Sequence, residues 1–494
     1  QATDNGLGDT AGTLSWAILQ ANTDGETLNS GNSTGTDDTI TLQTNVQIDG
    51  VMLTLLNSNI AIIGNGFTID GDSSTDADTD GDFRPLFVKS GTVTISNLTI
   101  ANGLAKGGNA DRAGAGAGMG GGLFIYDGDV ALTNVTFNNN QAVGGSSDNQ
   151  GGGRGGGGMF GRSNDFGSGG LFANYDSDDN DYGGNGNYGG GNGRFGGGNT
   201  YGGSSGRSGG FGGGGTYGGN NGGNGGFGGG GGAGDRGNGG SGGYGGGGSA
   251  SIQDGRSGSG GFGGGSNGNG GGAGMGGAVF VRSGTLNIVD SVFEDNSASG
   301  GTGSAGGSSG QGLGGAIFAI TQAALDANPV NQGEPGTLPT VTTAGSVTFS
   351  DNTAADATSQ TNTGTNGVGA SQDNKDIFGT ITEPDTTAPT LTNFTRQAPT
   401  NVDTDADALT FRAIFDEAVQ NVDAADFVVN GTTATISGVS GSGTTWDITV
   451  DGGDLNNLNG TVSLDLAAAP TITDLAGNTL PAGEPATDEV YILS

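Results

Sequence analysis

Short runs of alternating apolar and polar residues fill residues 44–143, and Asn, Gly and Asp separate one run from the next. Such alternation predicts β-strands, because successive side chains of a strand point to opposite faces. The expected strands are Val46–Ile48, Leu53–Leu55, Ile60–Ile63, Phe67–Ile69, Leu86–Val88, Val93–Ile95, Leu98–Ile100, Leu123–Tyr126, Val130–Leu132 and Val135–Phe137. Strands this short and evenly spaced are typical of a solenoid, in which each coil stacks on the one before it.

A repeated sequence motif supports the solenoid. Its copies are Gly118-Met-Gly-Gly-Gly-Leu-Phe124, Gly274-Met-Gly-Gly-Ala-Val-Phe280 and Gly312-Leu-Gly-Gly-Ala-Ile-Phe318, and Val130–Asn140 likewise matches Leu286–Asn296 and, in shorter form, Ser346–Asn352. The first two copies flank a glycine-rich block, residues 144–274. We therefore expect solenoid coils over 44–143 and 275–379, with the block as one enlarged loop whose ends lie close together.

The glycine-rich block has the composition of a flexible linker. Ordering it costs on the order of 1–2 kcal/mol per residue in backbone entropy. Extended strands of polyproline-II type have no internal hydrogen bonds, so their N–H and C=O groups can pair with neighbours on several sides. Two interpretations remain open: a polyglycine-II-like bundle, or a contact surface between subunits. The aromatic residues within the block are expected to pack on glycine backbone or between subunits.

Residues 1–43 are interpreted as a cap. Leu14–Asn22 has the pattern of a short amphipathic helix with Thr13 as its N-cap, and Asp38–Leu42 that of a strand. The sequence Gly12-Thr-Leu-Ser-Trp-Ala-Ile-Leu-Gln-Ala-Asn22, followed by Asp38-Thr-Ile, resembles the N-terminal cap of secreted bacterial right-handed parallel β-helix proteins. It departs from that family at Ser15, where Arg is usual. In the family a longer strand precedes the cap than Gln1–Thr3, so the resemblance implies an open strand edge.

Residues 380–388 are expected to be a linker, and residues 389–494 change character, with fewer glycines and longer strands typical of a small β-sandwich. Asp385-Thr-Thr-Ala-Pro389, Phe415-Asp-Glu-Ala-Val419 and Ile472-Thr-Asp-Leu-Ala-Gly-Asn478 resemble the bacterial immunoglobulin-like repeats of large surface adhesins. The expected fold is therefore all-β: a right-handed parallel β-helix with a glycine-rich insertion and a C-terminal immunoglobulin-like domain.

The amino-acid composition limits the partners and the chemistry that this chain can have. The chain has 50 acidic and 14 basic residues and a formal charge of −36, which disfavours nucleic acid and anionic membranes as partners. It has no Cys and no His, so it lacks disulfides, thiolate metal sites and the commonest general base. No apolar run approaches the ~20 residues that span a bilayer. With a start at Gln1 rather than Met, as after removal of a signal peptide, we expect a secreted protein located outside the cell or on its surface.

Two calcium sites are predicted. In Asp76-Ala-Asp78-Thr-Asp80-Gly81-Asp82, oxygens recur at alternate positions around a glycine turn, as a hard cation such as Ca²⁺ requires. Phe87 stands where an EF-hand has its final acid, so we expect a Ca²⁺ loop on a solenoid corner; the alternative is a solvated acidic turn. The resemblance to adhesins implies a second Ca²⁺ at Asp385, with Asp416 or Glu417.

An enzyme is not expected. The polygalacturonase arrangement needs His and Arg-x-Lys, which the chain lacks, and the solenoid's basic residues form no cluster: Arg84, Lys89, Lys106, Arg112 and Arg282. We expect a structural protein that binds itself head to tail in a surface filament or layer. The strand ending at Ser494, or a loop of another subunit, is expected to complete the open edge. The alternatives are a monomeric adhesin or glycan-binding protein, with extracellular polysaccharide as partner, and a Ca²⁺-dependent polysaccharide lyase.

Overall fold

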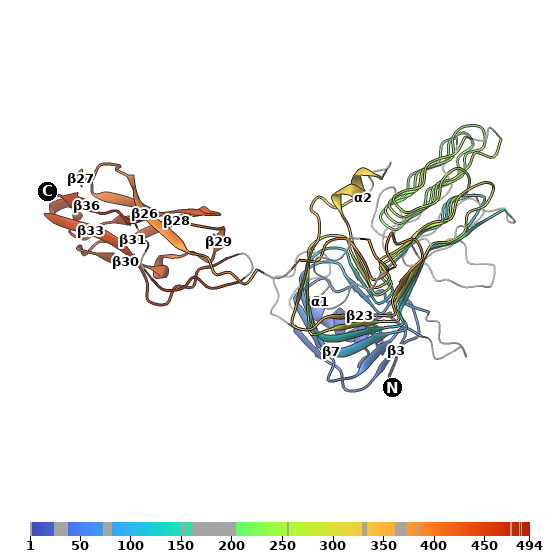
Figure 1. The fold of residues 1–494 in the computed structure, drawn as a ribbon, viewed down its shortest axis with the longest axis horizontal. Helices are drawn as coiled ribbons and strands as arrows, with labels where there is room; N and C mark the ends of the chain where they lie inside the picture. The colour runs from blue at the N-terminus through green and yellow to red at the C-terminus, as the bar shows by residue number, and fades with distance from the viewer. Residues whose placement is uncertain are drawn as a thin grey trace. The chain divides into compact units, whose positions relative to one another are not determined.

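The computed structural model describes residues 2–23, 38–72, 82–149, 154–159, 204–253, 256–328, 333–360, 373–382, 385–474, 477–483, 485 and 487–494. The chain divides into two compact units, Gln1–Glu383 and Pro384–Ser494, and this division falls within the predicted linker. Figure 1 draws both units. The fold is all-β, and the first unit is built from several parallel sheets.

The largest sheet of the first unit stacks equivalent strands in register. Its strands are β1 (Ala2–Asp4), β2 (Asp38–Thr41), β3 (Val46–Ile48), β4 (Ile60–Ile63), β5 (Thr68–Asp70), β7 (Thr92–Ala101), β12 (Asp129–Asn138), β17 (Thr285–Val289), β18 (Val292–Glu294), β22 (Thr340–Ala344) and β23 (Thr348–Ser350). Val93 pairs with Val130 and Val130 with Leu286, so the predicted repeat is confirmed residue by residue.

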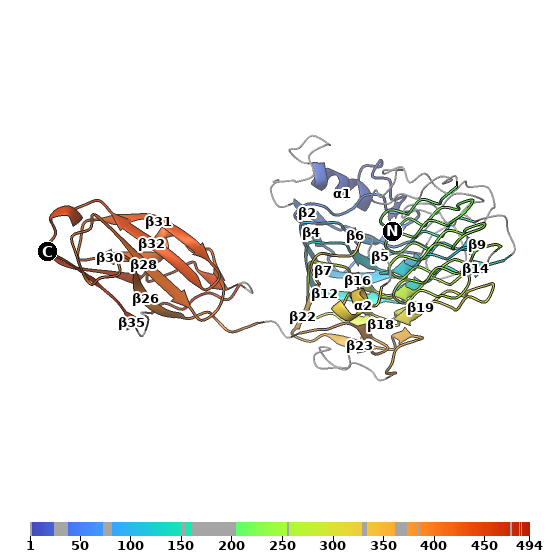
Figure 2. The same cartoon turned by 90° about the horizontal axis from the view of Figure 1, so that it is seen from above.

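Three further parallel sheets form the other walls of the stack (Figure 2). One contains β6 (Leu86–Val88), β11 (Leu123–Ile125), β16 (Val279–Val281), β21 (Ile317–Ala319) and β25 (Ile377–Phe378); the second contains β8 (Leu104–Lys106), β13 (Gln141–Val143), β19 (Ser297–Ser299) and β24 (Thr353–Ala354); and the third contains β10 (Gly118–Met119), β15 (Gly274–Met275) and β20 (Gly312–Leu313). A small pair joins β9 (Ala110–Asp111) to β14 (Ser147–Asp148), and two helices, α1 (Leu14–Thr23) and α2 (Gln322–Asp326), complete the described secondary structure of this unit.

Two details differ from the sequence-based expectation. The pairs of short strands expected on either side of Asn97 and Asn134 each form one continuous strand, β7 and β12, because these asparagines take a left-handed backbone conformation (φ 55° and 53°) without ending the pairing. Leu53–Leu55 forms no strand; the neighbouring Leu56 makes only an isolated bridge to Val88.

The glycine-rich block is packed against the stack by backbone hydrogen bonds. Gly272 N–H donates to Gly145 O at 2.9 Å, so the two ends of the block lie together, as an enlarged loop requires. The central segment, Gly230 to Gly232, bonds to six other segments: its N–H groups donate to Gly157, Gly247 and Gly223, and its carbonyls accept from Gly215, Gly114 and Gly240. A Cβ on Gly230 would lie 2.0 Å from Gly114 O, so only glycine permits this approach.

Two ladders of aromatic rings join the block to the stack. Phe211, Phe227, Tyr244 and Phe262 each precede a glycine with φ of 75–79°, and consecutive rings stack with centroids 5.0, 5.1 and 5.4 Å apart. The second ladder comes from the repeat: Phe87, Phe124, Phe280, Phe318 and Phe378, spaced 4.6–5.1 Å. The ladders meet edge to face, as at Phe227 and Phe280 (6.1 Å), and this shared aromatic core offsets part of the entropy cost of ordering the block.

The second unit packs two mainly antiparallel sheets on one apolar core. The first has the order β31 (Thr435–Ser442), β32 (Thr445–Asp451), β28 (Ala408–Phe415), β26 (Leu391–Ala398), β35 (Thr487–Asp488); the second has the order β27 (Asp403–Thr404), β36 (Tyr491–Leu493), β33 (Gly460–Leu466), β30 (Phe427–Asn430); and β29 (Val419–Gln420) pairs with β34 (Thr473–Asp474). Two 3₁₀ turns, Ala424–Asp426 and Leu455–Asn457, connect strands.

The last strand corrects one expectation. β36 pairs with β27 on one side and β33 on the other, and the side chains of Tyr491 and Leu493 are buried in the core. The strand that ends at Ser494 is therefore used within its own unit, because releasing it to complete another edge would expose that core.

Candidate functional site

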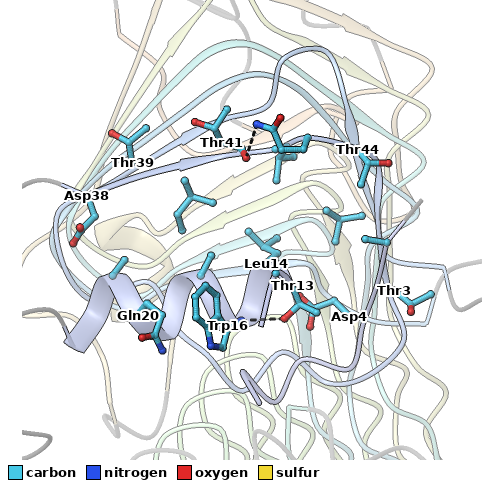
Figure 3. A pocket seen from close by; sticks show the side chains of 18 of the residues that line it. Thr3, Asp4, Thr13, Leu14, Trp16, Gln20, Asp38, Thr39, Thr41 and Thr44 are labelled. Carbon is cyan, nitrogen blue, oxygen red and sulfur yellow. Dashed lines mark hydrogen bonds between the residues drawn. The ribbon is translucent and has the colours of Figure 1, made fainter. Parts of the chain in front are cut away.

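A groove of about 730 Å³ opens at the end of the stack that carries the N-terminal strands, between helix α1 and strands β1 and β2 (Figure 3). Its apolar lining is Leu14, Ala17, Ala21, Ile40, Leu42 and Val46. Trp16 and Gln20 line the groove from helix α1, on the side of the helix away from β2 in this view, and Thr39 and Thr41 point away from the helix. The groove therefore has an apolar floor and a polar rim.

The helix start is tied to β1 by a buried pair. The Asp4 carboxylate accepts hydrogen bonds from the backbone N–H and the hydroxyl of Ser15, and both side chains are buried. Thr13 Oγ1 accepts from Trp16 N–H at 3.3 Å, which confirms Thr13 as the cap of the helix. Ser15 is the position at which the chain departs from the β-helix cap pattern, and here it holds the helix against β1 through Asp4.

Among the described residues, strand β2 pairs with β4 alone, so its other edge along this groove is open. Asp38 N–H and Leu42 N–H donate to Asn59 O (3.1 Å) and Ile63 O (2.9 Å) beside and within β4. Alternate residues of a strand direct their N–H and C=O groups to opposite sides, so Thr39 and Thr41 direct theirs away from β4. The side chain of Gln43 makes one long hydrogen bond, 3.5 Å, to Thr41 O. The groove thus combines an apolar floor with backbone groups that a further strand can pair.

The first predicted calcium site is only partly described. Asp76, Asp78 and Asp80 lie outside the described residues. Asp82 is described, half-buried, and its N–H donates to Gly71 O at 3.0 Å.

The second predicted site contains three carboxylates. Oxygens of Asp385, Glu417 and Asp474 lie within 4.8 Å of one another. Asp416, the alternative partner, instead accepts a hydrogen bond of 2.7 Å from Thr390 N–H. The sequence reasoning missed Asp474, although it lies in the motif 472–478 that carries the resemblance to adhesins.

Asn478 holds this cluster together. Its Nδ2 donates to Asp385 O (2.9 Å), to Thr387 O (3.2 Å) and to a carboxylate oxygen of Asp474 (2.8 Å). Burial, followed by the charges of Asp385, Asp474 and Asp416, raises the pKa of Glu417 above its ordinary value. Three neighbouring carboxylates offer the hard oxygen ligands that Ca²⁺ takes; calcium here is a proposal, made below.

Two basic residues of the first unit are structural in their contacts. Arg84 is buried and donates to Gly120 O (2.7 Å) and Met119 O (2.6 Å), and burial lowers its pKa to about 9. Arg282 donates to Gly333 O (2.9 Å from Nε) and lies 4.2 Å from the ring centroid of Tyr126. Both guanidinium groups support turns and aromatic rings.

No family model, curated protein or solved structure matches this chain. Among the described residues, we find no helix with the length and apolar character needed to cross a membrane. The function proposed for this chain therefore rests on its own geometry and chemistry.

Proposed function

We propose that this protein is an extracellular structural protein whose copies join head to tail into a surface filament or layer. The observation that carries the proposal is the groove beside β2, where apolar side chains and the outward backbone groups of Thr39 and Thr41 lie together. A β-strand added to an open edge gains main-chain hydrogen bonds and buries its alternate side chains. A contact between two different surfaces of one chain propagates without closing.

We further propose the finer fold on three grounds. Parallel sheets that gain one strand from each repeat fit a right-handed parallel β-helix. The six-neighbour hydrogen bonding around Gly231 fits polyglycine II, and the two facing sheets of the second unit fit an immunoglobulin-like domain. All three are stiff elements, as a load-carrying extracellular protein needs.

Calcium would add stiffness at the start of the second unit. An ion bound by Asp385, Glu417 and Asp474 would fix the 385–387 segment to β34, where Asn478 already contacts both. The segment Asp76–Asp82 is proposed as a second, independent Ca²⁺ site on its acidic sequence alone.

Electron microscopy of the purified chain with Ca²⁺ tests the assembly. We expect filaments or layers from the native chain and none from Thr41→Pro. Proline removes only an N–H that faces away from β4, so the fold and the unfolding temperature should be retained. Thr41→Ser keeps that N–H and should assemble as the native chain does. Native protein that remains monomeric at high concentration would refute the proposal.

A second function, glycan binding, is favoured by the rim of the same groove. Trp16 lies beside Gln20 and Thr13, and an aromatic face with neighbouring amide and hydroxyl groups is suited to a sugar ring. Binding of extracellular polysaccharide on a glycan array, lost in Trp16→Ala while filaments persist, would favour this function over self-assembly at the groove.

A further inference from the structure

We propose that the strand pairing with the open edge of β2 is β31 of a second copy. This inference rests on the proposed head-to-tail assembly and names its two surfaces: the groove of the first unit and the Thr435–Ser442 edge of the second. The occupant is thus another copy of the same chain, and each copy carries one surface of each kind.

β31 is the outermost strand of its sheet. Within the part of the chain that the structure describes, it pairs with β32 only, in the order β31-β32-β28-β26-β35, and most of its residues are exposed. Its outward side chains are small: Ser437, Ser440 and Ser442. A long edge strand without Lys, Pro or an acid is open to pairing with another strand, and proteins usually protect such edges.

Charge favours β31 over other surfaces of a second copy. The chain carries −36, so two copies repel each other over most of their surfaces. Residues 431–446, which contain β31 and its turn, include no charged residue. On the groove side, the carboxylate of Asp4 is buried and accepts hydrogen bonds from Ser15, and Asp38 at the start of β2 is the other acid that lines the groove. β31 therefore brings no charge of its own to the groove, so like-charge repulsion at this contact is smaller than between two acidic surfaces.

β36, the strand of the second unit that was expected to complete the open edge, is excluded because it is packed within its own unit. β36 is paired on both sides, and its side chains Tyr491 and Leu493 are 0% and 1% exposed. Pairing through β31 needs no such unfolding, because β31 pairs with β32 alone among the described strands and most of its residues are exposed. Since β2 and β31 lie on different units, the contact is heterologous and repeats from copy to copy.

Disulfide trapping tests the pairing, because the chain has no cysteine of its own. Thr41→Cys is mixed under mild oxidation with Ser437→Cys, Ser440→Cys or Ser442→Cys, each on a separate copy. A disulfide requires Cα atoms about 4.4–6.8 Å apart, so only adjacent strands are trapped. We expect covalent dimers from at least one of the three mixtures, in several-fold excess over Thr41→Cys mixed with Thr461→Cys, an exposed position on β33 in the other sheet.

The outcomes separate this inference from the proposed function. Filaments by microscopy without a trapped dimer from any of the three mixtures would overturn the pairing with β31 and leave head-to-tail assembly standing. Covalent dimers formed by Ser440→Cys in the absence of Thr41→Cys would overturn the pairing of β2 with β31 in favour of a symmetric β31–β31 contact. As a second measurement, Ser440→Lys should shift assembly to several-fold higher protein concentration, whereas Thr461→Lys should not. Native protein without any assembly would refute both proposals.

Discussion

The side-chain amide of Asn352 donates a hydrogen bond of 3.0 Å to a carboxylate oxygen of Asp376, and both residues are buried, at 0% exposure. This bond ends a ladder. Asn140 Nδ2 donates to Asn296 Oδ1 (2.9 Å), and Asn296 Nδ2 donates to Asn352 Oδ1 (2.9 Å). Each asparagine ends one repeat, so the ladder runs along the interior of the stack. The carboxylate oxygen of Asp376 accepts this bond, and it suits the last rung.

Asp376→Ala should destabilise the first unit. It leaves a buried N–H group of Asn352 without its acceptor, which costs about 1–3 kcal/mol. Asp376→Asn keeps an oxygen acceptor and should therefore destabilise the first unit less than Asp376→Ala does. Denaturant unfolding of the first unit, followed separately from that of the second, measures both changes. Equal midpoints for the two variants would contradict the ladder's role.

Tyr244→Phe should leave the protein as stable as the native chain or more stable. The ring is buried in the aromatic ladder, where the other three rungs are phenylalanine, and its hydroxyl has no hydrogen-bond partner among the residues that the structure describes. Removing an unpaired buried hydroxyl removes its desolvation cost. Tyr244→Ala is the matched control and should lose about 3–5 kcal/mol, as large aromatic truncations do.

The same residue predicts a pH dependence. Burial, and then the charge of Glu334, raises the pKa of Tyr244 well above its ordinary value. Its unfolded form loses a proton near pH 10 while the folded form does not, so stability falls as pH rises above 10. Tyr244→Phe should show a smaller fall over that range in thermal unfolding. An identical pH dependence in the two proteins would argue against a buried, protonated phenol.

The periodic parts of the fold were predictable from the sequence. Gly118, Gly274 and Gly312 pair in register because a repeated motif occupies equivalent positions in stacked coils. The helix over Leu14–Thr23 followed from its apolar spacing and cap. The prediction of a strand at Leu53–Leu55 was wrong. Its apolar and polar residues alternate as they do in the neighbouring strands, but among the described residues this segment meets no partner strand in register.

The features that depend on distant contacts were not predictable. The sequence shows aromatic residues followed by glycine at Phe227 and Tyr244, yet it does not show that these rings face Phe280 and Phe318. Asp474 lies near Glu417 because β29 pairs with β34, and Asn478 ties Asp385 to Asp474; both are contacts between segments far apart in the chain. Packing between distant segments, rather than the local sequence pattern, determines both the facing aromatic rings and the carboxylate cluster.

Gly230→Ala should destabilise the glycine-rich block. The new Cβ would meet Gly114 O at 2.0 Å, and both sides of that contact are backbone, so a neighbouring segment must move. Overpacking typically costs about 1–3 kcal/mol. Gly336→Ala is the control: nothing lies within 4 Å of its Cβ position, and a change within about 0.5 kcal/mol is expected. Hydrogen exchange of the block's amides should increase in Gly230→Ala; unchanged protection would contradict the tight packing.

Calcium should stabilise the second unit through Glu417, and pH should reveal it. Burial and the charges of Asp385 and Asp474 raise the pKa of Glu417 above 4.5, so its folded form holds the proton to higher pH than its unfolded form. In chelator, the second unit should therefore lose stability as pH rises from 4.5 through that raised pKa, and Glu417→Gln should abolish this loss. A bound cation favours the ionised form, so Ca²⁺ should reverse the trend, adding ~2.7 kcal/mol at 100 times its Kd.

Calorimetry should show binding to the native chain, weaker binding to Asp474→Asn, and native affinity in Asp407→Asn, an exposed acid outside the cluster. Because Asp76–Asp82 is proposed as a separate site, the decisive reading is the unfolding of the second unit: a midpoint insensitive to Ca²⁺ in the native chain would rule out calcium at Glu417.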